Sequence, residues 1–146
     1  MSITIENLHA ALAGESQAHI KYRYFAKIAR AEGHEDVAKH FEHTADQELL
    51  HAWGHLELLI GKTDTRKCLE LAIQGETEEF TEMYPRMERE AVAEGNDAAA
   101  QEAREQTQES IEHAEQFKKV LAKAELRFKA LKGVETFEEF ESNKNV

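Results

Sequence analysis

Glutamate and histidine residues at helical spacing are the part of this sequence best suited to chemistry. Glu48 and His51 lie three residues apart, so a helix places their carboxylate and imidazole groups on one face. Bundles that hold two carboxylate-bridged metal ions use one glutamate from each of two helices and a Glu-x-x-His pair from each of the other two. Glu15 and Glu76 lie on two further predicted helices. These residues together predict a metal site.

An internal repeat places a second histidine in the same pattern. Gly14–Ser16 matches Gly75–Thr77, and His51 and His113 each lie 18 residues after the glycine of an Ala-Glu-Gly triplet. A bundle with pseudo-two-fold symmetry would bring the repeated glutamates and histidines together near its middle. The predicted metal ligands are Glu15, Glu48, His51, Glu76, Glu79 and His113.

The alternative is that each of these residues is exposed to solvent and binds no metal ion. A lone Glu-x-x-His pair arises easily by chance in a chain with 29 acidic residues and eight histidines. Glu15, however, shares its helix face with Leu8, Leu12 and Tyr22, and a glutamate in an apolar stripe needs a partner or a metal ion. The four glutamates of the predicted set also balance the charge of two divalent cations.

Glycine residues divide the sequence into four long predicted helices. The helices span residues 5–32, 35–60, 65–94 and 98–132, and they end at Gly33, Gly61, Gly95 and Gly133. Short joints pair the first helix with the second and the third with the fourth. The predicted fold class is therefore all-α, an antiparallel four-helix bundle of two helical hairpins over residues 1–133.

Two local features modify this pattern. The second repeat has one extra residue beside Pro85, which predicts a kink or a π-bulge in the third helix. Thr136 and Glu139 resemble a capping box, so residues 134–146 are predicted to form a short helical or disordered tail.

Composition narrows the classes of function. The chain has 146 residues and a formal net charge of -11, which disfavours nucleic acid and anionic membrane surfaces as partners. A single cysteine, Cys68, excludes an internal disulfide, a Cys-x-x-Cys redox pair and a four-cysteine metal site. No apolar run approaches the ~20 residues of a membrane span. We therefore expect a soluble cytoplasmic protein that does not bind membranes.

Three stretches of the chain resemble the rubrerythrin family in its ferritin-like di-iron domain: Gly14–Ala26, Phe41–His51 and Gly75–Pro85. The resemblance implies a ferritin-like fold in which the six predicted ligands bind two non-haem iron ions. It also implies that Tyr22 and Tyr84 hydrogen-bond the ligand carboxylates. Plain core aromatics are the alternative for both tyrosines.

The same resemblance implies a peroxide reductase. Two ferrous ions would give two electrons to the O–O bond of hydrogen peroxide, and one iron would move between His51 and Glu79. The rubredoxin module of the family needs two Cys-x-x-Cys pairs, and this chain has only Cys68. An external electron donor, such as a rubredoxin-type protein or a reductase, is therefore expected.

Ser110 is the main departure from the family pattern, because the second bridging carboxylate would fall at this position. Glu109 or a solvent ligand would then substitute for it, or the site would hold a single metal ion or zinc. The alternative function is an iron or zinc binding or storage protein without peroxidase turnover.

The joint between the two hairpins is as short as the joints within them. The five Cα steps across Gly61–Asp64 span at most ~18 Å, whereas the ferritin-like topology needs a connection that runs back along the bundle. Either the bundle is simply up-down-up-down, or the second hairpin packs on the first hairpin of another chain. We favour exchange within a homodimer, because exchange preserves the ferritin-like arrangement.

Overall fold

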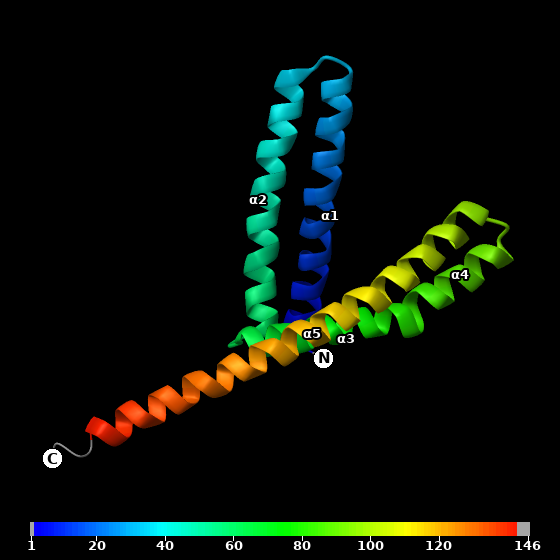
Figure 1. The fold of residues 1–146 in the computed structure, drawn as a ribbon. Helices are drawn as coiled ribbons and strands as arrows, with labels where there is room; N and C mark the ends of the chain where they lie inside the picture. The colour runs from blue at the N-terminus through cyan, green and yellow to red at the C-terminus, as the bar shows by residue number, and fades with distance from the viewer. Residues whose placement is uncertain (1, 143–146) are drawn as a thin grey trace. The chain divides into compact units, whose positions relative to one another are not determined.

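The computed structural model describes residues 2–142, and the side chains of residues 2–132. The elements in chain order are α1 (Ile3–Ala31), α2 (Glu35–Ile60), α3 (Thr65–Glu78), a π-helical turn η1 (Glu79–Met83), α4 (Tyr84–Ala93) and α5 (Asp97–Ser142). The described residues outside these helices form only short turns and joints (Figure 1). The predicted all-α class is therefore confirmed.

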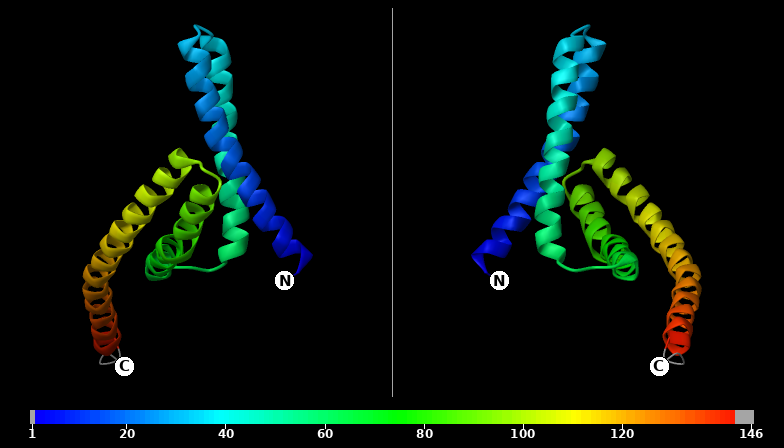
Figure 2. Two further views of the ribbon diagram at one scale, coloured as in Figure 1. Left: turned by 90° about the vertical axis from the view of Figure 1, so that its right-hand side faces the viewer. Right: turned by 90° about the vertical axis from the view of Figure 1, so that its left-hand side faces the viewer.

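The chain divides into two compact units, which are described separately. The first unit comprises residues 1–62, where α1 and α2 form an antiparallel hairpin. The second unit comprises residues 63–146, where α5 runs back along α3, η1 and α4. Figure 2 shows the paired helices of each unit from two further sides. The four helices and two hairpins predicted from the sequence are confirmed.

Left-handed glycines make the turns within both hairpins. Gly33 has a φ of 86° between α1 and α2, and Gly95 has a φ of 70° between α4 and α5. This backbone region is cheap for glycine and costly for residues with a Cβ atom. The turn after Gly95 then leads into a capped helix, because the Asn96 side chain accepts a hydrogen bond from the Ala99 amide at 3.1 Å.

The predicted irregularity beside Pro85 is confirmed as the π-helical turn η1, which ends at Met83, just before Tyr84 and Pro85. Proline lacks the amide hydrogen that continues an α-helical ladder, and its ring crowds the preceding turn. The Thr77 and Thr81 hydroxyls each donate to a carbonyl one turn earlier, at 2.6 Å in both cases. The one-residue insertion shifts the helix face that follows Glu79.

The predicted helix end at Gly133 is wrong, because α5 continues without a break to Ser142. A glycine inside a helix costs only about 1 kcal/mol relative to alanine, and the preceding Ala130, Leu131 and Lys132 are strong helix formers. Residues 134–142 therefore continue α5, and residues 143–146 lie outside the described residues. The division into a bundle over residues 1–133 and a tail over 134–146 stays a prediction.

Small residues form the most buried part of each hairpin. Ala26, Ala29 and Ala38 are buried in the first unit with Phe41 packed against them, and Ala103 and Ala114 are buried in the second. Alanine allows two helix backbones to approach closely. Among the residues whose side chains are described, no large side chain is fully buried. A two-helix hairpin is too thin to cover its own large apolar residues.

Large apolar side chains are consequently exposed on both units. In the first unit Ile20, Leu50 and Trp53 are 65%, 61% and 56% exposed, and in the second unit Val120 is 48% exposed. Further helices packed against each hairpin would bury residues of this kind. The described part of the chain has no helix long and apolar enough to cross a membrane.

Candidate metal centre

Three predicted ligands converge in the first unit. Glu15 comes from α1, and Glu48 and His51 lie one turn apart on α2. His51 Nδ1 lies 3.6 Å from Glu15 Oε2 and 3.5 Å from Glu48 Oε2. One ligand atom from each of the three residues lies within 4.8 Å of the others. Two carboxylate oxygens and an imidazole nitrogen at this separation can bind a divalent cation.

The two carboxyl groups of this trio shift each other's pKa in opposite directions. Hydrogen bonding with Glu48 holds the pKa of Glu15 below its ordinary value, and the nearby His51 lowers it further. The pKa of Glu48 is raised by its hydrogen bond to Glu15 and by burial. Two adjacent carboxylates cannot both ionise without repulsion. A bound cation would remove that repulsion and displace the proton.

In the second unit, Glu76 and Glu79 each contact one residue of α5. Glu76 Oε2 from α3 lies 3.4 Å from His113 Nδ1 on α5. Glu79, the first residue of η1, accepts a hydrogen bond of 2.9 Å from the Ser110 hydroxyl. Throughout the described residues, only Glu15, Glu48 and His51 form a compact group of three acidic, histidine or cysteine ligands. The second set is therefore not assembled as tightly as the first.

One carboxylate oxygen of Glu76 in the second unit has the surroundings expected of a metal ligand. Glu76 Oε2 is buried and has no hydrogen-bond partner. A buried carboxylate oxygen without a partner is costly, so such atoms are rare in folded proteins. Glu76 and His113 also line a cavity of about 310 Å³ with Gln116, Phe117 and Val120. The donor atoms and the unpartnered oxygen together fit a divalent metal ion beside Glu76.

The two predicted tyrosines differ in their surroundings. Burial raises the pKa of Tyr84, and the negative charges of Glu79 and Glu76 raise it further. Its hydroxyl group therefore keeps its proton near the predicted ligands and can act as a donor. The ring of Tyr22 lies 6.3 Å from that of Phe25 and 6.0 Å from that of Phe41, measured between centroids. Tyr22 is thus part of an aromatic cluster in the first unit.

Ser110 and Glu109 are neighbours on α5 but differ in their exposure to solvent. Ser110 is 3% exposed, and it is the one buried polar residue among those whose side chains are described. Glu109, the expected substitute for a carboxylate at position 110, is exposed. The contact between Ser110 and Glu79 was not foreseen from the sequence. The repeat, which pairs Ser110 with Glu48, and the extra residue beside Pro85 were the signals that pointed to this region.

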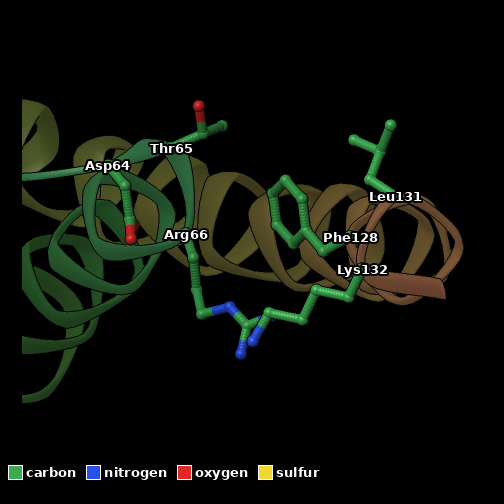
Figure 3. A pocket seen from close by; sticks show the side chains of 6 residues that line it. All are labelled: Asp64, Thr65, Arg66, Phe128, Leu131 and Lys132. Carbon is green, nitrogen blue, oxygen red and sulfur yellow. The ribbon is translucent and has the colours of Figure 1, made fainter. Parts of the chain in front are cut away.

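A cavity of about 420 Å³ in the second unit has another chemical character (Figure 3). Its lining residues are Asp64, Thr65, Arg66, Phe128, Leu131 and Lys132. The Arg66 guanidinium lies 5.3 Å from the centre of the Phe128 ring, and Arg66 also pairs with Glu125 at 3.0 Å. Asp64 caps α3 by accepting a hydrogen bond from the Lys67 amide. These contacts give Arg66 and Asp64 structural roles, and none of the predicted ligands lines the cavity.

Comparison with known proteins identifies relatives over most of the chain. A protein-family model described as rubrerythrin matches residues 6–121. Nigerythrin from Nitratidesulfovibrio vulgaris is 38% identical over 129 residues, which are 78% of this chain and 63% of nigerythrin. Rubrerythrin from Porphyromonas gingivalis is 36% identical over 139 residues, which are 85% of this chain and 68% of that protein. The chain thus spans about two thirds of the length of these relatives.

Among solved structures, nigerythrin in its fully reduced, all-ferrous state is 33% identical to this chain. That match covers 86% of this chain and 69% of nigerythrin, with a TM-score of 0.43.

Proposed function

The chain belongs to the rubrerythrin family, and from this premise we propose that it is a non-haem di-iron oxidoreductase that reduces hydrogen peroxide to water. The observation that carries the proposal is the convergence of Glu15, Glu48 and His51 within 4.8 Å. The unpartnered oxygen of Glu76 supports a second cation position. Carboxylate and imidazole donors suit iron.

Six residues would hold the two iron ions: Glu15, Glu48, His51, Glu76, Glu79 and His113. When bound, the ferrous pair would supply the two electrons that cleave the O–O bond of hydrogen peroxide. The residues of the chain supply charge balance and positioning. The four glutamates match the charge of two divalent ions, and the protonated Tyr84 hydroxyl is a hydrogen-bond donor beside Glu79 and Glu76.

The electrons would come from a donor outside these 146 residues. Cys68 is the one cysteine of the 146-residue sequence, so these residues contain no four-cysteine iron centre. A rubredoxin-type protein or a reductase has the required chemistry. The proposed reaction therefore alternates between reduction by this external donor and oxidation by peroxide.

We also propose that the working form is a homodimer with exchanged hairpins. On α2, His51 lies nine residues before the end of the helix at Ile60. On α3, Glu76 lies 11 residues after the start of the helix at Thr65. In a ferritin-like bundle with the ligands at one level, those helix ends are about 30 Å apart at 1.5 Å per residue. The joint from Ile60 to Thr65 spans at most ~18 Å. Exchange between two chains removes the mismatch and covers the exposed apolar residues.

A second candidate function is iron or zinc binding without peroxidase turnover. Ser110 favours it, because a hydroxyl stands where the family pattern has a bridging carboxylate. A single metal ion held by Glu15, Glu48 and His51 would be consistent with this function. The two functions differ in metal stoichiometry and in turnover.

Iron-loaded protein, reduced under anaerobic conditions, tests the proposal directly. We expect two irons per chain and consumption of hydrogen peroxide faster than by the same concentration of free ferrous ion. Glu48→Gln should lose both properties, whereas Glu57→Gln, an exposed position on the same helix, should keep them. One metal ion per chain without turnover would instead favour the binding function, and a protein that retains no metal would rule out both functions.

A further inference from the structure

The charge of α5 changes sign along its length. Residues 97–117 of this helix include six acidic residues and one basic residue, whereas residues 118–132 include six basic residues and one acidic residue. Acidic residues begin again at Glu135, so acidic segments bound the basic one on both sides. Residues 118–132, the orange part of α5 in Figure 1, therefore reverse locally the charge of a chain whose formal net charge is -11.

The basic side chains of this segment are exposed. They are Lys118, Lys119, Lys123, Arg127, Lys129 and Lys132. The acidic residue among them, Glu125, is partly buried, and Arg66 of α3 offsets its charge at 3.0 Å. Among the side chains that the structure describes, none forms an ion pair with Lys119, Lys123 or Lys129. The positive charge of the segment is therefore presented to solvent.

The most regular row of these residues lies away from α3. Lys119, Lys123 and Arg127 follow one another at intervals of four residues, so they form one row along the helix. Glu125 and Phe128, which contact α3 through Arg66, lie on another side of α5. Lysine is almost never fully buried unless it is paired. Other helices that pack on this hairpin would therefore leave the row at the surface.

An exposed apolar residue lies between the basic ones. Leu126 is 70% exposed and lies three residues from both Lys123 and Lys129, so it is their neighbour on the helix surface. Protein interfaces commonly combine an apolar centre with a polar rim. The basic segment spans only about 21 Å at 1.5 Å per residue. A nucleic acid duplex would extend over the acidic segments on both sides and be repelled, whereas a small acidic protein fits.

The basic segment begins close to a predicted metal ligand. Lys119 lies six residues after His113 on α5, about 9 Å along the helix axis. Electron-transfer rates fall steeply with distance, so an electron carrier has to dock near the ligands. Weak encounters between redox proteins use small interfaces, and complementary charge steers such encounters. The position, size and charge of the segment all suit an electron carrier.

We propose that Lys118, Lys119, Lys123 and Lys129, with Leu126 at their centre, form a basic surface that docks an acidic electron-carrier protein. The inference rests on the proposed function and names the surface that receives its external donor. Reduction of one hydrogen peroxide molecule to two water molecules takes two electrons and two protons. A carrier of one electron therefore docks twice for each peroxide, and each encounter oxidises one carrier.

Charge reversal tests docking without turnover. The probe is an oxidised rubredoxin with an acidic surface, titrated calorimetrically into the purified 146-residue chain at low ionic strength. Lys119→Glu/Lys123→Glu should weaken binding at least about tenfold, and Lys119→Arg/Lys123→Arg should keep it within about twofold. Lys21→Glu/Lys27→Glu is the matched control, because both lysines are exposed on α1 and the net charge changes equally. Circular dichroism verifies that each variant is folded.

Reduction kinetics connect the basic surface to the reaction. Anaerobic stopped flow mixes reduced rubredoxin with oxidised, iron-loaded protein. In Lys119→Glu/Lys123→Glu the second-order rate constant should fall about ten- to hundredfold at low ionic strength, and the difference from the wild type should shrink as salt is added. Reduction by a small uncharged quinol should be equal in both proteins, because a quinol needs no docking surface. Leu126→Ala should weaken rubredoxin binding about fivefold at every ionic strength.

The outcomes separate the docking surface from the proposed function. The inference is wrong if the wild type does not bind the rubredoxin, or if Lys21→Glu/Lys27→Glu weakens binding as much as Lys119→Glu/Lys123→Glu. Tighter binding of a short DNA duplex or of phosphatidylserine vesicles at the same ionic strength would also overturn it. A wild type that binds the rubredoxin through this surface but consumes no peroxide would contradict the proposed function and support the docking surface.

Discussion

The two units carry the same repeat but prepare their metal ligands to different degrees. In the first unit Glu15, Glu48 and His51 already lie within 4.8 Å of one another. In the second unit Glu76 meets only His113 among the predicted ligands, and Glu79 is bonded to Ser110. Equivalent positions on paired helices therefore do not guarantee equivalent sites.

The difference follows from one substitution and one insertion. Serine at position 110 removes the carboxylate that would hold His113 as Glu48 holds His51. The one-residue insertion that forms η1 shifts the helix face after Glu79, and Glu79 at the start of η1 accepts a hydrogen bond from Ser110 on α5. In the first unit the hydrogen bond to Glu15 raises the pKa of Glu48, whereas in the second unit Glu76 Oε2 is buried without a hydrogen bond, 3.4 Å from His113 Nδ1. A bound cation would therefore satisfy a buried oxygen of the second half-site that has no hydrogen bond.

The largest expected effect is on metal content, in a mixture of two variants that each lack the ligands of one unit. The mixture tests whether one metal centre needs both units and whether two chains supply them. One variant carries Glu15→Ala and Glu48→Ala in the first unit, and the other carries Glu76→Ala and His113→Ala in the second. Neither alone should retain the di-metal centre. After the two are unfolded together and refolded, exchanged dimers should recover about one quarter of the wild-type metal content, since random pairing gives half heterodimers with one intact centre each.

Metal analysis by mass spectrometry and the molecular mass in solution check this result. The control is the same mixture combined without unfolding, in which recovery should be slower. If the refolded mixture binds no more metal than the separate variants while the refolded wild type binds fully, the hairpins are not exchanged.

The pH dependence of cation binding should distinguish the half-sites by about tenfold per pH unit. Glu48 has a raised pKa, so below that pKa the first unit holds a proton that a cation must displace. Affinity should therefore rise with pH through the raised pKa and then level off. The stability that protonated Glu48 gives to the metal-free hairpin has the opposite pH dependence, and it is lost as pH rises through the raised pKa of Glu48.

Calorimetry of Mn²⁺ binding in two buffers with different ionisation enthalpies measures the released proton. For each Mn²⁺ ion that the variant still binds, Glu48→Gln should release fewer protons than the wild type. An unchanged proton release in Glu48→Gln would show that the proton comes from elsewhere.

Removing the unpartnered carboxylate should stabilise the metal-free protein. Glu76→Leu should raise the free energy of unfolding by about 1 kcal/mol, because it eliminates a buried oxygen without a hydrogen bond, and the 3.4 Å contact of that oxygen with the half-exposed His113 ring only weakly offsets the cost of burying it. Glu15→Leu should lower it, because Glu15 hydrogen-bonds Glu48 and lies beside His51. Urea unfolding with a chelator present measures both changes. Equal effects of the two substitutions would contradict the contrast between the half-sites.

Much of this arrangement was predictable from spacing. The glycines marked both hairpin turns, and the extra residue beside Pro85 marked η1. Helical periodicity placed Glu48 and His51 on one face, and the convergence of Glu15 with them followed from pairing α1 with α2. The hydrogen bond from Ser110 to Glu79 could not be predicted, because it depends on the conformation of the Glu79 side chain at the start of the π-helical turn. The continuation of α5 also escaped prediction, because a glycine ends a helix only where the chain turns.

The smallest expected effects are on stability, from substituting one glycine in the backbone of each unit. Gly33 has a φ of 86° in the turn of the first unit, so Gly33→Ala should destabilise the protein by about 1 kcal/mol. Gly133 lies within α5, so Gly133→Ala should stabilise that helix by roughly 0.5–1 kcal/mol through higher helix propensity. Thermal unfolding measures both shifts. Destabilisation by Gly133→Ala would contradict a continuous α5, because alanine is costly only where glycine leaves the helical region.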